Sequence, residues 1–395
     1  MRDWCPPEQG TRCFDQLPAT VERLLTGPND GPTLEEPLLR EPFERVAFVY
    51  FDAFGWTFLE RHASHPVFDR ARSDGLLTRL TAQFPSTTTA QVTTVHSGLT
   101  VAEHGLYEWH VYEPTLDRLI TPLLFSFAGD GMRGSLFGKI DPDDLFPTDS
   151  VYARLAEAGV PSAVVLPAAI AESAPNLALL RGTEVVPFST AEGGLAAASG
   201  ALTAGAGYAH VYLDELDSLM HAVGPDDPLA DAGARLVLDA LAGATFPAGT
   251  LVLVTADHGM SPVDPARTVY VNELWPELAL HLETGADHKP LAPAGSCRDL
   301  FLHARPEQVE TVCDELGERL TGVADVVPVD DLVAEGIFAE PSRRLRERLA
   351  TVVVLPYHGE AVYWHEPGRF VQQLHGQHGG LSPQEMEIPL VAWVA

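Results

Sequence analysis

Arg45-Val46-Ala47-Phe48-Val49-Tyr50-Phe51-Asp52 is an apolar run closed by a carboxylate. A continuous apolar run of this length is typical of a strand that is buried on both faces of a parallel sheet. Residues 208–213 and 250–256 repeat the pattern and lead into Asp214 and Asp257. Because helix-like segments separate these runs, the sequence predicts an α/β fold with a mostly parallel central sheet flanked by helices.

The pattern changes after residue 261 and returns near the C-terminus. Short strand-like runs at residues 299–304 and 350–355 alternate there with a charged helix over 307–320, which is typical of an α+β unit. The last apolar run, at residues 388–392, has the character of a strand that rejoins the main sheet. We therefore expect a lead-in segment at residues 1–40, a main core at 41–261 and 371–395, and a smaller embedded α+β subdomain at 262–370.

Composition and charge exclude several classes of protein. The 395 residues are 46% hydrophobic and 20% charged, as expected for a globular chain that buries a sizeable core. The formal net charge of −30 argues against a nucleic-acid polymer or an anionic membrane as a partner, because no basic patch is available to contact phosphates. Nothing in the sequence indicates the oligomeric state.

Two absences favour a soluble, cytoplasmic protein. No apolar run is long enough to cross a bilayer, and the N-terminus lacks the apolar core of a signal peptide. The four cysteines form no CxxC pair, so we expect free thiols in a reducing compartment, with a disulfide between Cys5 and Cys13 as the alternative.

A second informative stretch is Phe84-Pro85-Ser86-Thr87-Thr88-Thr89, which precedes a helix-like run. Ser and Thr are favoured just before the first turn of a helix, where their side chains meet free backbone N–H groups. Such a helix start is positive and suits a phosphate, and a threonine there could attack phosphorus if its pKa were lowered. The alternative interpretation is a capped surface helix.

Carboxylates and histidines recur at the predicted strand ends. Asp52 and the pair Asp257-His258 each follow an apolar run, where open α/β sheets bind ligands. Asp217 and His221 are four residues apart, so on a helix they share one face and can hold one ion. Oxygen and imidazole ligands without thiolate suit Zn²⁺, and Mn²⁺ is also acceptable. Phosphoryl transfer uses metals about 4 Å apart, and coordination lowers the pKa of a hydroxyl.

Each of these parts has a structural alternative. Asp52 and Asp214 could cap helices, and residues 257–259 could form an ordinary turn. Asp217 and His221 could be a solvated helix pair. Hydrogen-bonded or loop positions would explain three further histidines, which are His104, His375 and His378. The ligand interpretation is favoured because all of these alternatives would have to hold at once.

The order of the motifs resembles the alkaline phosphatase superfamily, and its type I phosphodiesterase/nucleotide pyrophosphatase family in particular. The resemblance covers residues 45–391. Its segments in chain order are Asp52, Phe84-Pro85-Ser86-Thr87-Thr88-Thr89, Ala102-Glu103-His104-Gly105, residues 214–225, Ala256-Asp257-His258-Gly259-Met260 and Gln377-His378-Gly379-Gly380-Leu381. The family implies a central sheet between helices, two zinc ions and a threonine that becomes transiently phosphorylated. Residues 41–261 and 371–395 would then be an alkaline phosphatase-like catalytic core, and 262–370 a cap over its site.

The resemblance also implies a role for each matching residue. One zinc ion would be held by Asp52, Asp257, His258 and the oxygen of Thr88, and the other by Asp217, His221 and His378. Thr88 keeps the family's spacing from the nucleophile to the helix-closing Gly98, and a one-residue slip to Thr87 or Thr89 stays open. His378 is preferred to His375 because Gly-Gly-Leu follows it.

The chain departs from the family's pattern after its His-Gly turn. Nucleotide-cleaving members carry there an asparagine that contacts the phosphoryl oxygen, whereas this chain has Leu106-Tyr107-Glu108-Trp109-His110. A nucleotide substrate is therefore in question. The sulfatase signature Cys-x-Pro-x-Arg and the serine nucleophile of the phosphomonoesterase branch are absent, which favours diesters.

The sequence thus predicts a metal-dependent hydrolase of phosphodiester or pyrophosphate bonds, acting through a phospho-threonine intermediate at a di-zinc site. Its partner would be a small-molecule phosphoester, nucleotides included. The alternatives are a phosphomonoesterase or phosphonate hydrolase of the same superfamily and, from a different class, a non-catalytic binding protein with this fold.

Overall fold

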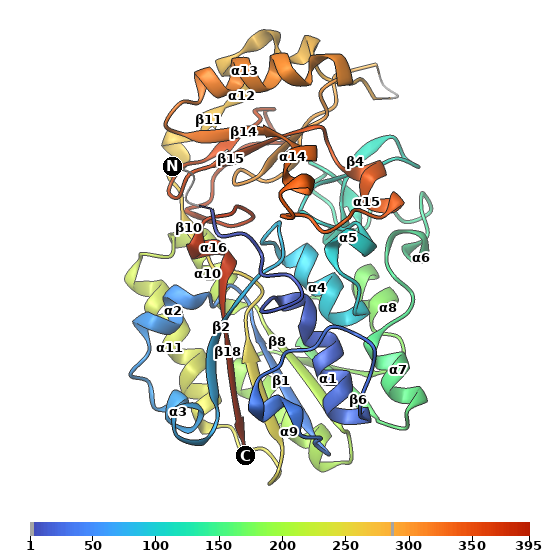
Figure 1. Ribbon diagram of the computed structural model, residues 1–395, viewed down its shortest axis with the longest axis vertical. Coiled ribbons are helices and arrows are strands. Elements are labelled where there is room, and N and C mark those ends of the chain that lie inside the picture. Colours follow the sequence, from blue (N-terminus) through green and yellow to red (C-terminus); the bar gives the residue numbers. More distant parts are fainter. Residues whose placement is uncertain (1–3, 286–287) are drawn as a thin grey trace.

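Seven strands form the central sheet of the computed structural model, which describes residues 4–285 and 288–395 (Figure 1). Their order across the sheet is β2-β18-β9-β1-β8-β6-β7, and β18 alone runs in the direction opposite to the other six strands. The bounds are β1 Val46–Phe51, β2 Leu76–Thr81, β6 Ser162–Pro167, β7 Glu184–Phe188, β8 Tyr208–Leu213, β9 Leu251–Thr255 and β18 Glu387–Val394. The predicted α/β class is confirmed.

The middle of the sheet is made of the three strands that the apolar runs predict. Every residue of β1, β8 and β9 is buried, because helices cover both faces of the sheet (Figure 1). On one face α1 (Leu17–Thr26), α4 (Thr88–Ser97) and α7 (Val151–Glu157) pack together, and α9 (Ala191–Thr203) and α11 (Pro228–Gly243) lie on the other. Parallel strands so ordered bring Asp52, Asp214 and Asp257 to one edge of the sheet.

A smaller, four-stranded sheet lies beyond that edge. Its order is β12-β13-β15-β14, and α13 (Val309–Arg319) packs on it around a separate apolar cluster that includes Leu300, Val312 and Val354 (Figure 1). The strand bounds are β12 Ala294–Gly295, β13 Leu300–Leu302, β14 Ala324–Pro328 and β15 Val352–Pro356. The limits of the embedded subdomain at residues 262 and 370 stay predictions.

Some elements were not expected from the sequence. Edge strands β2 and β7 complete the central sheet, and β7 contains Pro187, which sequence patterns place outside strands. A three-stranded sheet that no sequence pattern predicted is formed by β3 Val111–Glu113, β4 Arg118–Thr121 and β5 Ser126–Phe127. No helix in the described ranges is both long and apolar enough to cross a membrane.

Two glycines allow the turns after β1 and β9 to touch. A Cβ on Gly55 would lie 2.5 Å from the Cα of Gly259, and a Cβ on Gly259 would lie 2.0 Å from the carbonyl oxygen of Gln384. The N–H of Gly259 also donates to the carbonyl of Glu385 at 2.8 Å, which ties this turn to α16 (Pro383–Met386). The close approach of these turns sets Asp52 beside Asp257.

Gly259→Ala should therefore destabilise the protein strongly. The added Cβ meets backbone atoms that no side-chain rotation can move, so we expect a loss of about 2 kcal/mol or more in the free energy of unfolding. Gly200→Ala is the matched control, because no atom lies within 4 Å of its Cβ and the position is helical. Urea unfolding of both variants measures the effect, and a Gly259→Ala protein as stable as wild type would contradict this account of the turns.

Candidate active site

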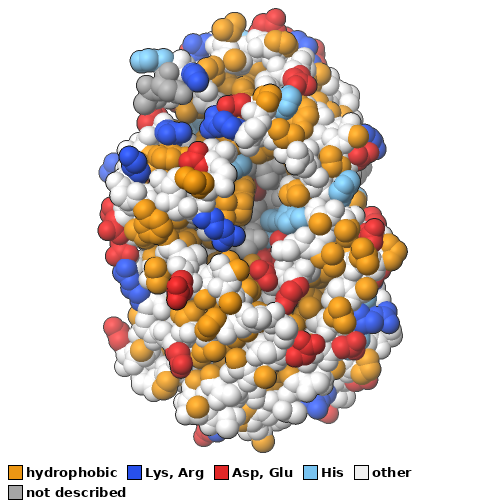
Figure 2. Space-filling view, turned by 180° about the vertical axis from the view of Figure 1, so that it is seen from behind, with side chains coloured by type: hydrophobic (Ala, Val, Ile, Leu, Met, Phe, Trp, Pro, Cys, Tyr) orange, Lys and Arg blue, Asp and Glu red, His pale blue; other side chains and the backbone are white. Residues whose placement is uncertain are grey.

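A cleft of about 730 Å³ opens at the carboxyl edge of the central sheet. Strand-end turns, the start of α4 and the segment around residue 296 of the smaller sheet all contribute to its wall. Figure 2 shows this hollow, with histidine and acidic side chains around it. Its lining includes Asp52, Thr88, Tyr212, His221, Ser296 and His378.

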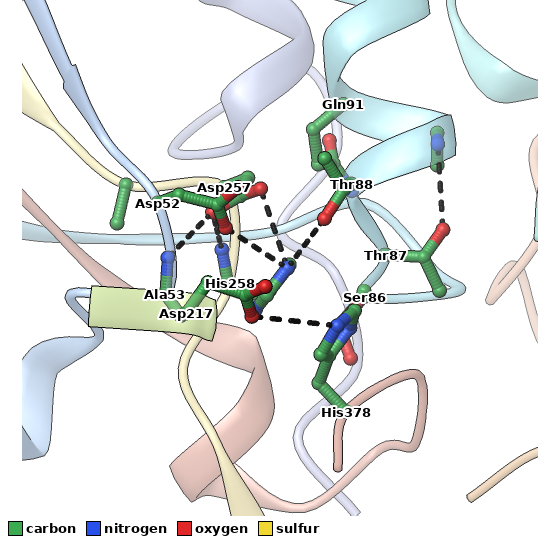
Figure 3. Close-up of polar contacts among 12 residues, drawn as sticks. Asp52, Ala53, Ser86, Thr87, Thr88, Gln91, Asp217, Asp257, His258 and His378 are labelled. Carbon is green, nitrogen blue, oxygen red and sulfur yellow. Dashed lines mark hydrogen bonds and ion pairs between the residues drawn. The ribbon is translucent and has the colours of Figure 1, made fainter. Parts of the chain in front are cut away.

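Asp52 and Asp257 each offer one oxygen that has no hydrogen-bond partner (Figure 3). The Oδ2 of Asp52 accepts the hydroxyl of Tyr212, and its Oδ1 lies 3.6 Å from Nε2 of His258. The Oδ1 of Asp257 accepts the N–H groups of Ala53 and His258, each at 3.0 Å, and its Oδ2 lies 3.3 Å from the same Nε2. The two unpartnered oxygens thus converge on one nitrogen.

A second cluster stands beside the first. Asp217 and His221 lie one turn apart on α10 (Glu215–Val223), and His378 follows β17 (Gly376–Gln377). The unpartnered Oδ1 of Asp217 lies 3.4 Å from Nε2 of His221 and 3.8 Å from Nε2 of His378. In each cluster the three ligand atoms lie within 4.8 Å of one another, which is a spacing that one metal ion can bridge.

The three histidines are held in the tautomer that a metal needs. Each donates its Nδ1–H to a backbone carbonyl, at 2.9 Å for His258, 2.7 Å for His221 and 3.0 Å for His378. The acceptors are the carbonyl oxygens of Gly259, Gly376 and Ser86. The lone pair on each Nε2 therefore faces the cluster, in the arrangement that orients metal-binding imidazoles.

The clusters are adjacent rather than independent. The rings of His258 and His378 are stacked, with their centroids 3.6 Å apart. One ring belongs to each cluster, so two ions bound here would be close neighbours. Two-metal phosphoryl transfer sites hold their ions about 4 Å apart, and adjacent clusters are compatible with such a site.

Burial without a cation perturbs the pKa values of these groups. Desolvation raises the pKa of Asp257 to about 6, and desolvation with nearby Asp257 raises that of Asp217 to about 6 as well, against the lowering effect of His221. The pKa of Asp52 is raised well above its ordinary value by desolvation and by the two other aspartates. In the described ranges only histidines form ion pairs with these carboxylates. A divalent cation would supply the missing positive charge, so the donor set fits a metal.

Of the three threonines, Thr88 faces the clusters. It is the first residue of α4, and its Oγ1 lies 3.1 Å from Nε2 of His258 (Figure 3). The hydroxyl of Thr87 instead caps the helix by accepting the N–H of Ala90 at 3.3 Å, and Thr89 is buried.

Other residues singled out in the sequence lie outside the clusters. Asp214 lines the cleft at the start of α10. The backbone carbonyl of His375 accepts a hydrogen bond from the N–H of Val263. The turn that replaces the family's asparagine places Glu108 and His110 in the cleft wall, where they are 1% and 7% exposed. Tyr212 was not predicted, although a tyrosine within an apolar strand and two residues before an aspartate is a usable signal.

His104 is a buried structural histidine. Its Nδ1 accepts the N–H of Leu106 at 3.0 Å, so its Nε2–H donates to Oγ1 of Thr94 at 3.1 Å. Protonation of Nδ1 would point its new N–H at the N–H of Leu106 and break that hydrogen bond. Desolvation, with a smaller effect of nearby Arg348, lowers the pKa of His104 to about 3.

Comparison with known proteins places the chain in a family. The family model for type I phosphodiesterase / nucleotide pyrophosphatase matches residues 46–381. No curated protein matches the chain significantly. Three solved structures have similar folds. Murine ectonucleotide pyrophosphatase / phosphodiesterase 5 is 19% identical, with 89% of this chain and 88% of that chain covered and a TM-score of 0.62. The human protein of that name is 18% identical, with 88% of this chain and 87% of that chain covered and a TM-score of 0.63. Phosphonoacetate hydrolase from Sinorhizobium meliloti is 18% identical, with 89% of this chain and 90% of that chain covered and a TM-score of 0.62.

Burial of His104 should make the free energy of unfolding depend on pH. The unfolded chain protonates this histidine near pH 6.5, whereas the folded protein resists protonation down to about pH 3. Stability due to His104 is therefore present above about pH 6.5 and falls by about 1.4 kcal/mol per pH unit below it. His104→Asn keeps an acceptor for Leu106 and does not titrate. In urea unfolding of the metal-free proteins, the stability gap between wild type and variant should shrink by about 2 kcal/mol from pH 7.5 to pH 5; a constant gap would contradict this.

Proposed function

We propose that this chain, which belongs to the type I phosphodiesterase/nucleotide pyrophosphatase family of metal-dependent phosphoric ester hydrolases, cleaves phosphodiester or pyrophosphate bonds of small molecules in this cleft. The observation that carries the proposal is the convergence of three unpartnered carboxylate oxygens and three imidazole nitrogens beside one threonine hydroxyl. If these aspartates served only the fold, the cost of burying their unpartnered oxygens would not be offset by any interaction.

The residues fit two zinc ions. Asp52, Asp257 and His258, with the oxygen of Thr88, would hold one ion. Asp217, His221 and His378 would hold the other. Bound zinc would neutralise the charge that develops on the phosphoryl group and lower the pKa of the threonine hydroxyl. Mn²⁺ is compatible with the same oxygen and nitrogen donors.

Thr88 would be the nucleophile. Its place in the first turn of α4 puts a bound phosphoryl group near free backbone N–H groups and the positive end of the helix. Attack by Thr88 Oγ1 on phosphorus expels the leaving group and gives a phospho-threonine, which water then hydrolyses. An inactive variant of the murine protein, with a threonine replaced by alanine, is described in complex with AMP, which supports a threonine in this role.

A second candidate function is phosphonate or phosphomonoester hydrolysis with the same nucleophile. The bacterial structure of similar fold is a phosphonoacetate hydrolase described in complex with phosphonoformate, and in another case with phosphonoacetate. Glu108 and His110 line the cleft of this chain, in the turn where the resemblance to nucleotide-cleaving members would place an asparagine. Rates on diester, monoester and phosphonate analogues separate the two candidates, and a protein without turnover on any of them would be a binding protein.

Thr88→Ala should abolish turnover of bis(4-nitrophenyl) phosphate by the zinc-loaded protein. Loss of the nucleophile is expected to lower kcat by about 10³-fold or more. Thr88→Ser is the matched control, because it keeps a hydroxyl at the same atom and should retain measurable activity. Thr89→Ala should retain most of the rate. Wild-type kcat in Thr88→Ala would show that another residue attacks phosphorus.

Metal removal should also abolish activity. We expect a chelator to inactivate the protein and zinc to restore it, with about two zinc ions per chain by elemental analysis. Asp217→Asn keeps the shape of the side chain but weakens one cluster, so this variant should retain about one ion per chain and lose most of its kcat. Full activity of a protein with no bound metal would contradict the proposed mechanism.

A further inference from the structure

Tyr212 holds the Asp52 carboxylate from the neighbouring strand. Tyr212 lies on β8 in parallel register with Tyr50 of β1, and its hydroxyl donates to Oδ2 of Asp52. The tyrosine is 9% exposed and lines the cleft, and its ring packs on that of Tyr50 with centroids 5.3 Å apart. The hydroxyl is thus fixed in place by the sheet itself.

This hydrogen bond decides which oxygen of Asp52 is free. With Oδ2 engaged, only the unpartnered Oδ1 faces Nε2 of His258. Asp257 follows the same rule, since two backbone N–H groups occupy its Oδ1 and leave Oδ2 unpartnered. Each carboxylate thereby presents one oxygen to a metal, and the other oxygen is held by the protein.

The two carboxylates differ in what holds them. Asp257 is held by backbone amides, which persist in any side-chain variant. Among the described residues, Asp52 accepts its side-chain hydrogen bond from the hydroxyl of Tyr212. One removable hydroxyl therefore fixes one side chain of the first cluster.

We propose that Tyr212 is a positioning residue that sets the zinc affinity of the Asp52–Asp257–His258 cluster selectively, by fixing Asp52 as a ligand through one oxygen. This inference rests on the proposed function, because it assumes that both clusters bind zinc. Without the hydroxyl, Oδ2 becomes a second unpartnered buried oxygen and the carboxylate is free to rotate. Removal of such an outer hydrogen bond typically lowers metal affinity by about 10–100-fold. The Asp217–His221–His378 cluster has no bond to Tyr212 among the described contacts and keeps its affinity.

The test is Tyr212→Phe, which deletes one oxygen atom and keeps the ring. Tyr208→Phe is the matched control, because Tyr208 is a buried tyrosine four residues earlier on the same strand whose hydroxyl meets His210 at 3.4 Å. Both proteins and wild type are loaded with zinc and titrated with a chelator, and zinc release is followed with a colorimetric indicator. In Tyr212→Phe we expect one zinc per chain to leave at an about 10–100-fold lower chelator concentration, while the second zinc leaves as in wild type.

A second readout separates positioning from packing. The melting temperature of metal-free Tyr212→Phe should match that of metal-free wild type closely, and Tyr208→Phe should release both zinc ions as wild type does. For bis(4-nitrophenyl) phosphate, kcat should fall with KM little changed, and excess zinc should recover much of the rate. Tyr212→Met also removes the hydroxyl but has a side chain of different shape, and it should show the same selective loss of zinc. It serves as the second variant if Tyr212→Phe packs poorly.

The outcomes distinguish this proposal from the proposed function. If Tyr212→Phe releases both zinc ions as wild type does, or releases both earlier to the same degree, the selective positioning role is wrong while the two-zinc hydrolase stands. If wild type retains no zinc and still hydrolyses the diester, both the positioning role and the proposed metal site are wrong.

Discussion

The site depends on an electrostatic constraint, which is that one buried oxygen from each of Asp52, Asp217 and Asp257 lies there without a described lysine or arginine as an ion-pair partner. Asp52, Asp217 and Asp257 each keep one oxygen without a hydrogen-bond partner, and the described ion pairs of these carboxylates involve only histidines. Such an arrangement opposes folding by raising the free energy of the charged carboxylates. Close-packed turns at Gly55 and Gly259 hold the backbone against this cost, and under the proposed function divalent cations would relieve it.

Hydrogen bonds link the start of α4, which carries Thr88, to the C-terminal part of the chain. Ser86, two residues before Thr88, accepts the Nδ1–H of His378 through its carbonyl and donates its hydroxyl to the carbonyl of Gly380 at 2.8 Å. The start of α4 and the loop of the second cluster are therefore joined at one buried serine. The fully buried ion pair of Arg298 with Glu385, at 2.8 Å, connects this loop region to the smaller sheet. Thr88 is thus placed by contacts on both sides of the cleft.

The sequence was informative where local pattern and site geometry coincide. The buried strands β1, β8 and β9 are continuous apolar runs, so the sequence alone places the aspartates after them at one edge of the sheet. Strand β7, which contains Pro187, and the two- to four-residue strands β3 to β5 have no such pattern. The hydrogen bond from Tyr212 to Asp52 could not be predicted, because it depends on the register between β1 and β8.

Charge considerations explain why the family indicates the reaction more firmly than the substrate. A chain of net charge −30 repels an anionic phosphoester at long range, but salt screens that repulsion beyond about 8 Å at physiological ionic strength. Under the proposed function, attraction would therefore have to be local. It would come from the start of α4, from Arg133 and Arg369 in the cleft wall, and from metal held by the two clusters. Glu108 lines the same wall and disfavours additional negative charge near it. Under the proposed function, substrate choice would lie in these wall residues, while the two Asp/His clusters and Thr88 would determine the chemistry.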